Sequence, residues 1–217
     1  MDKEQIQKRV DELKPFFHYF NFDGIETKPD GVGYREGRFY PKDLFGAFCN
    51  HLPELTGKRC LDIGCNNGFF SFELAKRGAI VKGIDNNQNN TGMIEKALFV
   101  KEVLGADVEF VIEDFMDEQE EILYDVILFL GVYYHLPKPE LAIPKLSRLL
   151  KAGGLLFLEN AIGNNIRYGD TGDIFDGDPT NFLIPSVEHL NKELSDNGFK
   201  ILEKLPYHRY FLKVEKC

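Results

Sequence analysis

The sequence is poor in cysteine, the residue that builds disulfide frameworks and many metal sites, with only 4 among 217 residues, and it has no tryptophan. No two cysteines form a CxxC pair, and none has the Cys/His spacing of a zinc site. We therefore expect reduced thiols and no bound metal, as is usual inside cells. The four cysteines are Cys49, Cys60, Cys65 and Cys217.

Long hydrophobic runs are also missing, since no apolar stretch approaches the roughly 20 residues of a membrane-spanning helix. The first residues, MDKEQIQKRVDELK, are charged and have a helical pattern, unlike a signal peptide. We expect a cytoplasmic protein with no membrane partner, either a monomer or a homodimer.

An excess of basic residues is absent as well, because the formal net charge is -9 and the pI is about 5.1. Proteins that bind nucleic acids usually have a basic surface that neutralises phosphates. This acidity disfavours a nucleic acid as a partner without excluding one, and it favours a small-molecule partner.

The sequence does have enough hydrophobic residues, 43% of the total, to form one sizeable hydrophobic core. From Lys58 onward, segments typical of strands and helices alternate, and the last two strands, FKILEKL and YHRYFLKVE, are joined by a short turn. This order predicts an α/β fold with a doubly wound, mostly parallel seven-stranded sheet and a C-terminal antiparallel hairpin. We expect two regions, residues 1–57 as an N-terminal helix and cap, and residues 58–217 as the main domain.

The N-terminal region combines a helix over residues 2–14 with an aromatic stretch over residues 15–41 that predicts loops or hairpins. A lid over a ligand and ordinary packing both fit this stretch. Its aromatic residues include His18, Tyr19, Phe20, Phe22, Tyr34, Phe39 and Tyr40.

The stretch LDIGCNNGFF, residues 61–70, joins a predicted strand to a predicted helix and is typical of a ligand-binding glycine loop. A nicotinamide-binding loop needs the pattern G-x-G-x-x-G, but Asn66 replaces the central glycine between Gly64 and Gly68. Asparagine tolerates the left-handed backbone of such a turn. Asp62 would repel a pyrophosphate but can hold an ammonium group, which favours a nucleoside that carries an amino acid.

Two further predicted strands end in carboxylates. Asp85 comes about twenty residues after the loop, where a carboxylate binds ribose hydroxyls. Glu113, Asp114 and Phe115 follow the next strand, where a carboxylate can accept from an adenine amino group beside an aromatic ring. Capping or solvated roles fit each residue alone, whereas their order along the chain favours a nucleoside site.

The successive patterns D-x-G-C-x-x-G, G-I-D, E-D-F and L-G-V-Y-Y-H resemble the class I S-adenosylmethionine-dependent methyltransferases, from about Lys58 to the C-terminus. The resemblance implies a methyltransferase with S-adenosylmethionine as its cofactor. The implied cofactor-binding residues are Asp62, Gly64, Cys65, Asn66, Gly68, Phe69, Asp85, Asn86, Glu113, Asp114, Phe115, Leu130 and Gly131.

Within this class, LFLGVYYHLPKPELAIPKLSRLLKAGGLLFLEN and NFLIPSVEHLNKELSDNGF resemble the bacterial tRNA wobble-uridine carboxymethyltransferases and their relatives. That family uses carboxy-S-adenosylmethionine, whose extra carboxylate is bound by a tyrosine after the loop and by an arginine before I-P-S. This chain has Phe69 at the first position and the acidic DGDPTNFLIPS at the second. Ordinary S-adenosylmethionine is therefore favoured, although Arg35, Arg38 or Lys42 could replace the arginine.

Candidate catalytic and substrate residues follow the fourth and fifth predicted strands. His135, in GVYYHLP, is the candidate general base, with a structural role as the alternative, and Tyr134 is a second catalytic candidate. Tyr133, Glu159 and Arg167 are candidates for substrate contact. Methylation of an oxygen, nitrogen or carbon in a small or conjugated metabolite is the leading hypothesis. A tRNA-modifying enzyme and a non-catalytic S-adenosylmethionine-binding protein are the alternatives.

Overall fold

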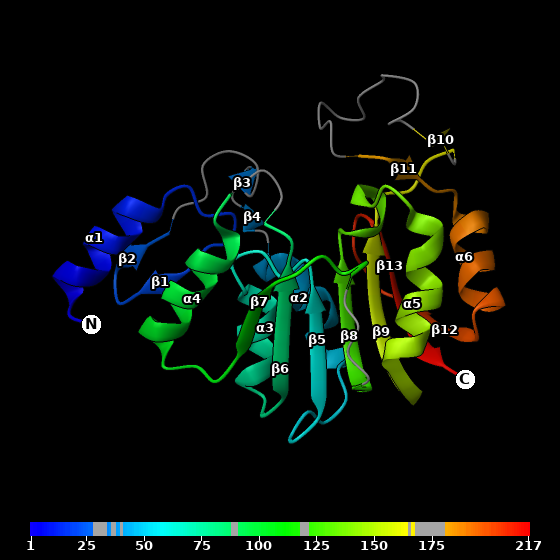
Figure 1. Cartoon of the computed structure of the whole chain (residues 1–217), viewed down its shortest axis with the longest axis horizontal. Coiled ribbons are helices and arrows are strands. Elements are labelled where there is room, and N and C mark those ends of the chain that lie inside the picture. The colour runs from blue at the N-terminus through cyan, green and yellow to red at the C-terminus, as the bar shows by residue number, and fades with distance from the viewer. Residues whose placement is uncertain are drawn as a thin grey trace. The chain divides into compact units, whose positions relative to one another are not determined.

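In the computed structural model (Figure 1), the chain forms two compact units, Met1–Phe115 and Met116–Cys217. Tyr40, Tyr168 and most of residues 162–179 lie outside the described residues. So do the side chains of Tyr34, Arg35, Arg38, Phe39, Ile166 and Arg167. The structure describes residues 1–27, 34–35, 38–39, 41–87, 91–117, 122–164, 166–167 and 181–217.

The main sheet has seven strands in the order β12-β13-β9-β8-β5-β6-β7. β6 pairs in parallel with β5 and β7, and β8 pairs in parallel with β9, whereas β13 pairs antiparallel with both β9 and β12. The predicted mostly parallel sheet with a C-terminal antiparallel pair is thus confirmed. The strands are β5 (Arg59–Ile63), β6 (Ile80–Asp85), β7 (Glu109–Ile112), β8 (Tyr124–Leu130), β9 (Leu150–Asn160), β12 (Phe199–Lys204) and β13 (Tyr210–Lys216).

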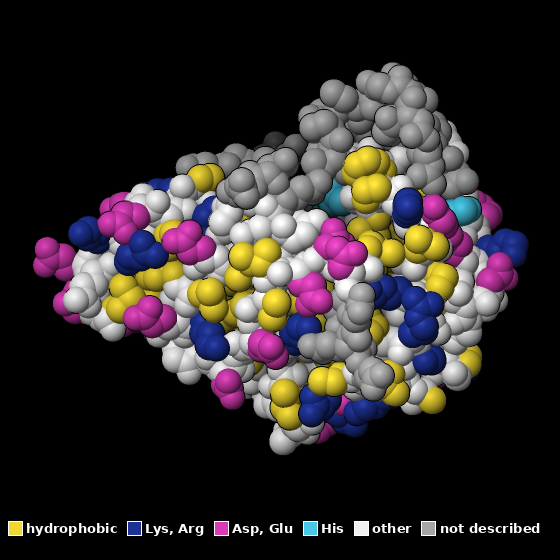
Figure 2. Space-filling view, viewed as in Figure 1, with side chains coloured by type: hydrophobic (Ala, Val, Ile, Leu, Met, Phe, Trp, Pro, Cys, Tyr) yellow, Lys and Arg dark blue, Asp and Glu magenta, His cyan; other side chains and the backbone are white. Residues whose placement is uncertain are grey.

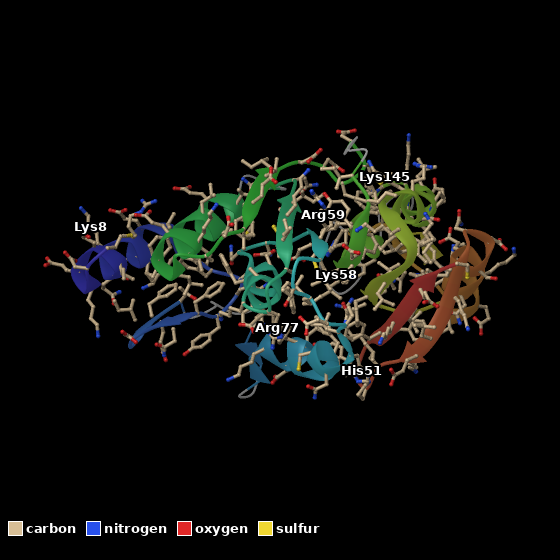
Figure 3. The ribbon with its side chains drawn as sticks, turned by 90° about the horizontal axis from the view of Figure 1, so that it is seen from below. Lys8, His51, Lys58, Arg59, Arg77 and Lys145 are labelled. Atoms are coloured by element: carbon tan, nitrogen blue, oxygen red, sulfur yellow. The ribbon has the colours of Figure 1, made fainter. Side chains whose placement is uncertain are left out.

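The N-terminal unit begins with α1 (Lys3–Leu13), whose first turn is closed by a capping box between Asp2 and Gln5. Lys8 projects from this helix into solvent (Figure 3). The aromatic stretch forms two short hairpins, as predicted. The further elements are β1 (Asn21–Phe22), β2 (Ile25–Glu26), β3 (Tyr34–Arg35), β4 (Arg38–Phe39), α2 (Lys42–Phe48), η1 (Cys49–His51), α3 (Phe69–Ala75) and α4 (Met93–Leu104).

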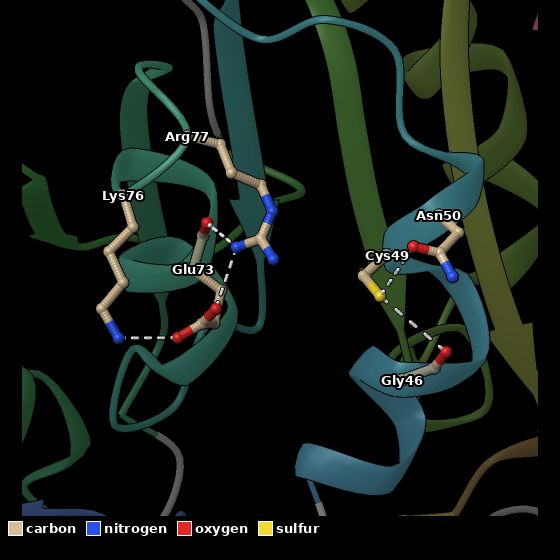
Figure 4. Close-up of polar contacts among 6 residues, drawn as sticks. All are labelled: Gly46, Cys49, Asn50, Glu73, Lys76 and Arg77. Atoms are coloured by element: carbon tan, nitrogen blue, oxygen red, sulfur yellow. Dashed lines mark hydrogen bonds and ion pairs between the residues drawn. The ribbon is translucent and has the colours of Figure 1, made fainter.

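Aromatic rings fill much of the space between these elements. Phe20 stacks on Phe22 and lies edge-on to Phe72, with centroid distances of 6.0 Å in both pairs. At the end of α3, Glu73 pairs with Lys76 and Arg77 (Figure 4), and the Arg77 guanidinium lies 4.6 Å from the ring centroid of Phe45 on α2. Phe20 and Phe22 are buried, so part of the aromatic N-terminal block is core packing. Burial of each such ring contributes about 2 kcal/mol to stability.

The C-terminal unit packs helices against β8, β9, β12 and β13. α5 begins at Ala142, so Pro144 lies in its first turn, where the missing N–H costs nothing. Ser186 caps α6 by accepting from the His189 N–H. The other elements are η3 (Tyr133–His135), η4 (Pro139–Leu141), α5 (Ala142–Leu149), β10 (Ile166–Arg167), β11 (Leu183–Ile184) and α6 (Val187–Asp196).

The visible surface of the N-terminal unit intersperses acidic and basic side chains (Figure 2). Among the described residues, no helix is long and apolar enough to cross a membrane. The four cysteines are all free thiols.

Candidate functional site

The glycine loop between β5 and α3 has a left-handed backbone at three positions, with φ of 69° at Gly64, 52° at Asn66 and 84° at Gly68. Asn66 thus adopts the conformation that its position requires, as predicted from its residue type. A Cβ at Gly68 would lie 2.6 Å from Cζ of Phe110, so no other residue fits without displacing that ring. The loop therefore keeps a tight, preformed turn at the start of α3.

Asp85, at the end of β6, fastens this turn. Its Oδ2 accepts from the Asn66 N–H at 3.0 Å, and its Oδ1 accepts from the Asn87 N–H at 2.9 Å. Burial raises the pKa of this carboxyl, although the two amide donors oppose the shift. The structure brings Asp85 and the loop together as the strand order predicted, and ribose binding by Asp85 stays a prediction.

Asp62 lies inside the unit, 2% exposed, and its Oδ2 accepts from the Ser71 hydroxyl of α3 at 2.6 Å. Burial raises its pKa to about 7, against the opposing effect of the Ser71 hydrogen bond. Sequence reasoning found Asp62 but missed Ser71, which lies one turn into α3 and faces the strand. Contact between Asp62 and a ligand's ammonium group stays a prediction.

The end of β7 lies beside the end of β6. Glu113 is ion-paired with the buried Lys82 at 3.2 Å, and its N–H donates to the carbonyl oxygen of Asp85. Asn86 donates to the Asp114 carboxylate at 3.4 Å, and Phe115 is buried. The candidates on the second and third predicted strands are thus neighbours, while adenine recognition by Asp114 and Phe115 stays a prediction.

A segment from the N-terminal region lies against the loop through Asn67, which sequence reasoning missed. The Asn67 Oδ1 accepts from the N–H groups of Phe17 and His18, at 2.7 and 3.1 Å. His18 accepts in turn from the Phe69 N–H through Nδ1 at 3.3 Å. Burial lowers the His18 pKa to about 3, so its ring is neutral and able to accept.

Cys65 is the remaining loop candidate. Its side chain is buried, and burial together with the nearby carboxylates Asp62 and Asp85 raises its pKa well above the ordinary value. The thiol is therefore protonated at neutral pH, so Cys65 contributes shape rather than charge.

In the C-terminal unit, the candidates gather where β8 and β9 end. Gly131, with φ of 71°, follows Leu130 and donates its N–H to the Glu159 carbonyl at 3.0 Å. A Cβ at Gly131 would lie 3.3 Å from the Tyr134 Oη and 3.6 Å from the Glu159 Oε2. The glycine therefore leaves room for two polar side-chain oxygens to approach the same point.

Arg209, which precedes β13, connects those two side chains. Its Nε lies 2.8 Å from the Glu159 Oε1, and its Nη1 donates to the Tyr134 Oη at 3.1 Å. Burial raises the pKa of Glu159 to about 7, although Arg209 opposes this shift. Sequence reasoning missed Arg209, and only the pairing of Tyr210 with Asn160 places it at this strand end.

Tyr133 and His135, on either side of Tyr134, lie in different surroundings. Tyr133 is fully buried and its hydroxyl donates to Glu193 of α6. The His135 ring centroid lies 4.3 Å from that of Tyr134, and the backbone N–H of His135 donates to the Val132 carbonyl. Arg167 pairs with Leu183 through its backbone, and its side chain is not described. The catalytic and substrate roles assigned to these residues stay predictions.

With this geometry established, comparison with known proteins identifies the class. Residues 55–202 match the family described as methyltransferase domain, and the chain belongs to that family. The class I fold and the sheet order agree with this membership.

Two curated relatives are named as O-methyltransferases of ubiquinone biosynthesis. The chain is 32% identical over 113 residues to a ubiquinone biosynthesis O-methyltransferase of Burkholderia vietnamiensis, covering 52% of this chain and 48% of that protein. It is 32% identical over 138 residues to the same-named enzyme of Pseudomonas aeruginosa, covering 62% and 59%. The chain thus spans about half the length of the curated relatives it matches.

Solved structures share the fold over most or all of the chain. The N-terminal domain of EvdMO1, solved with SAH bound, has a TM-score of 0.74 at 22% identity, covering 100% of this chain and 98% of that one. Magnesium protoporphyrin IX methyltransferase from Synechocystis PCC 6803, solved with SAM bound, has a TM-score of 0.61 at 22% identity, covering 81% and 77%. The [4+2]-cyclase SpnF has a TM-score of 0.64 at 23% identity, covering 92% and 70%.

Proposed function

We propose that the protein transfers a methyl group from S-adenosylmethionine to a small or conjugated metabolite. The observation that carries the proposal is the glycine loop of a methyltransferase-family chain, held in a left-handed turn at Asn66 by the Asp85 carboxylate. The names of the curated relatives support an oxygen as the methylated atom.

The residues around the loop fit this cofactor. Gly64 and Gly68 supply the close backbone approach that an amino acid moiety needs, and Asp62 supplies a carboxylate for its ammonium group. Asp85 would hold the ribose, and Asp114 with Phe115 the adenine. When bound, the cofactor supplies an electrophilic methyl group on a sulfonium. The other residues of the proposed binding set are Cys65, Asn66, Phe69, Asn86, Glu113, Leu130 and Gly131.

We propose that Tyr134, His135 and Glu159 contact the methyl acceptor. A base is needed only where the acceptor atom carries a proton at neutral pH. His135 and Glu159 are the two candidate bases in the C-terminal unit, and Tyr133 is engaged with Glu193.

None of the relatives and solved structures named above is a tRNA wobble-uridine carboxymethyltransferase. Phe69 has no hydroxyl for a cofactor carboxylate, and its N–H already donates to His18. We therefore propose the ordinary cofactor. The fold alone does not decide the reaction, since a cyclase shares it.

Isothermal titration calorimetry with four ligands tests this proposal: S-adenosylmethionine, S-adenosylhomocysteine, carboxy-S-adenosylmethionine and NAD. We expect micromolar or tighter binding of the first two, at least tenfold weaker binding of the carboxy form and none of NAD. Preference for the carboxy form would redirect the search to tRNA. Binding of none of them by folded, ligand-free protein would overturn the cofactor assignment.

A further inference from the structure

Glu159 is a buried carboxylate with an incomplete set of partners. Its side chain is 1% exposed, and Arg209 forms an ion pair with it at 2.8 Å. Within the described part of the chain, however, its buried Oε1 receives no hydrogen bond of acceptable geometry. Nearly all buried polar atoms in folded proteins do have such a partner, so this oxygen calls for a donor from a ligand or a water.

The strands on either side of Glu159 supply no such donor through their side chains. Glu159 pairs with Leu130 on β8 and with Phe211 on β13, and both side chains are apolar and buried. The polar groups that face the carboxylate are the Arg209 guanidinium and the Tyr134 hydroxyl, whose oxygen lies with the Glu159 Oε2 around Gly131. The carboxylate therefore has one fixed cation and unused acceptor capacity.

Arg209 has two contacts that fix its orientation. Its Nε faces Glu159, while its Nη1 donates to Tyr134, whose ring centroid lies 4.8 Å from the guanidinium carbon. The guanidinium is planar and rigid, so these contacts hold the carboxylate and the tyrosine in one arrangement. Arg209 thus suits a positioning role.

We propose that Glu159 accepts a hydrogen bond, and then the proton, from a hydroxyl group of the methyl acceptor, with Arg209 as the positioning residue. This inference rests on the proposed methyl transfer and deepens it. The acceptor O–H bond breaks and its proton goes to Glu159, while an oxygen electron pair forms the bond to the methyl carbon. The S–CH3 bond breaks, its electron pair returns to sulfur as a neutral thioether, and Glu159 releases the proton to solvent.

The test measures binding of catechol to protein saturated with S-adenosylhomocysteine, by calorimetry or by saturation-transfer NMR at millimolar concentration. Its dimethyl ether, veratrole, keeps the ring but lacks both hydroxyl protons. We expect catechol to bind the wild-type protein more tightly than veratrole does, and Glu159→Gln to weaken catechol at least tenfold while leaving veratrole unchanged. Glu188→Gln, an exposed charge neutralisation on α6, is the matched control and should leave both unchanged.

The pH dependence of catechol binding tests the positioning role of Arg209. Catechol affinity for wild type should rise as Glu159 deprotonates through pH 7, and Glu159→Gln should abolish this rise. Arg209→Met should move the midpoint upward and Arg209→Lys should restore part of the shift, whereas a merely structural role would leave the midpoint in place.

Three outcomes would overturn the inference while leaving methyl transfer intact. They are S-adenosylhomocysteine binding without catechol binding by wild type, equal catechol affinity in Glu159→Gln, and a tenfold loss in His135→Gln but not in Glu159→Gln. Failure of S-adenosylhomocysteine to bind would instead contradict the proposed function itself.

Discussion

Two buried carboxylates, one in each unit, have the same raised pKa of about 7 but different partners. Asp62 accepts a hydrogen bond from Ser71 and has no cation in its described contacts. Glu159 has the cation Arg209 but no well-formed hydrogen bond. The charged form of Asp62 is thus stabilised by a hydrogen bond and that of Glu159 by a cation, while burial opposes both charges. Equal pKa values can therefore arise from different partners.

The largest expected effect comes from removing the cation. Arg209→Met leaves a buried charge unpaired, and we expect a loss of about 3 kcal/mol in the free energy of unfolding at pH 8. At pH 5 Glu159 is protonated and the loss should shrink to about 1 kcal/mol. Urea unfolding at both pH values measures the difference, and equal losses would mean that Arg209 stabilises by packing alone.

The next effect concerns Asp62. Its pKa is higher in the folded than in the unfolded protein, so the folded state binds more protons and stability falls as pH rises from about 4 through 7. Asp62→Asn removes this pH dependence. Relative to wild type, we expect the free energy of unfolding of the variant to rise by about 2 kcal/mol between pH 4.5 and 8. Thermal unfolding across that range checks the slope. If the thermal stability of the variant changed with pH in the same way as that of wild type, Asp62 would not be charged at pH 8.

Ligand binding should separate the two sites. Asp62→Asn should weaken S-adenosylhomocysteine by about tenfold, or 1.4 kcal/mol, and Glu159→Gln should change it less than twofold. Calorimetry on both variants gives the comparison. Equal losses in both would contradict the assignment of the cofactor to the loop in the N-terminal unit.

The smallest effect is expected at Ser71. Ser71→Ala removes the hydrogen bond to Asp62 and should cost about 1 kcal/mol at pH 8, where the carboxyl is charged. Because the bond stabilises the charged form, its loss should also raise the Asp62 pKa further. Chemical denaturation at pH 5 and 8 measures both, with Ser195→Ala on α6 as an exposed control.

The order of elements and the strand-end residues were predictable because both depend on local pattern. Asn66 follows from the turn it must adopt, and Asp85 from its distance past the loop. Ser71, Asn67 and Arg209 were not predictable in this way. Each acquires its partner through packing between segments far apart in the chain, such as the approach of residues 17–18 to the loop or the register of β13 on β9.

The anchorage of the N-terminal segment has a consequence for how this protein can diversify. Asn67 holds the segment by the backbone N–H groups of Phe17 and His18, which every residue except proline possesses. Substitution at position 17 by any residue except proline therefore keeps the N–H that Asn67 binds, whereas substitution of Asn67 by a residue without an acceptor oxygen removes both hydrogen bonds at once.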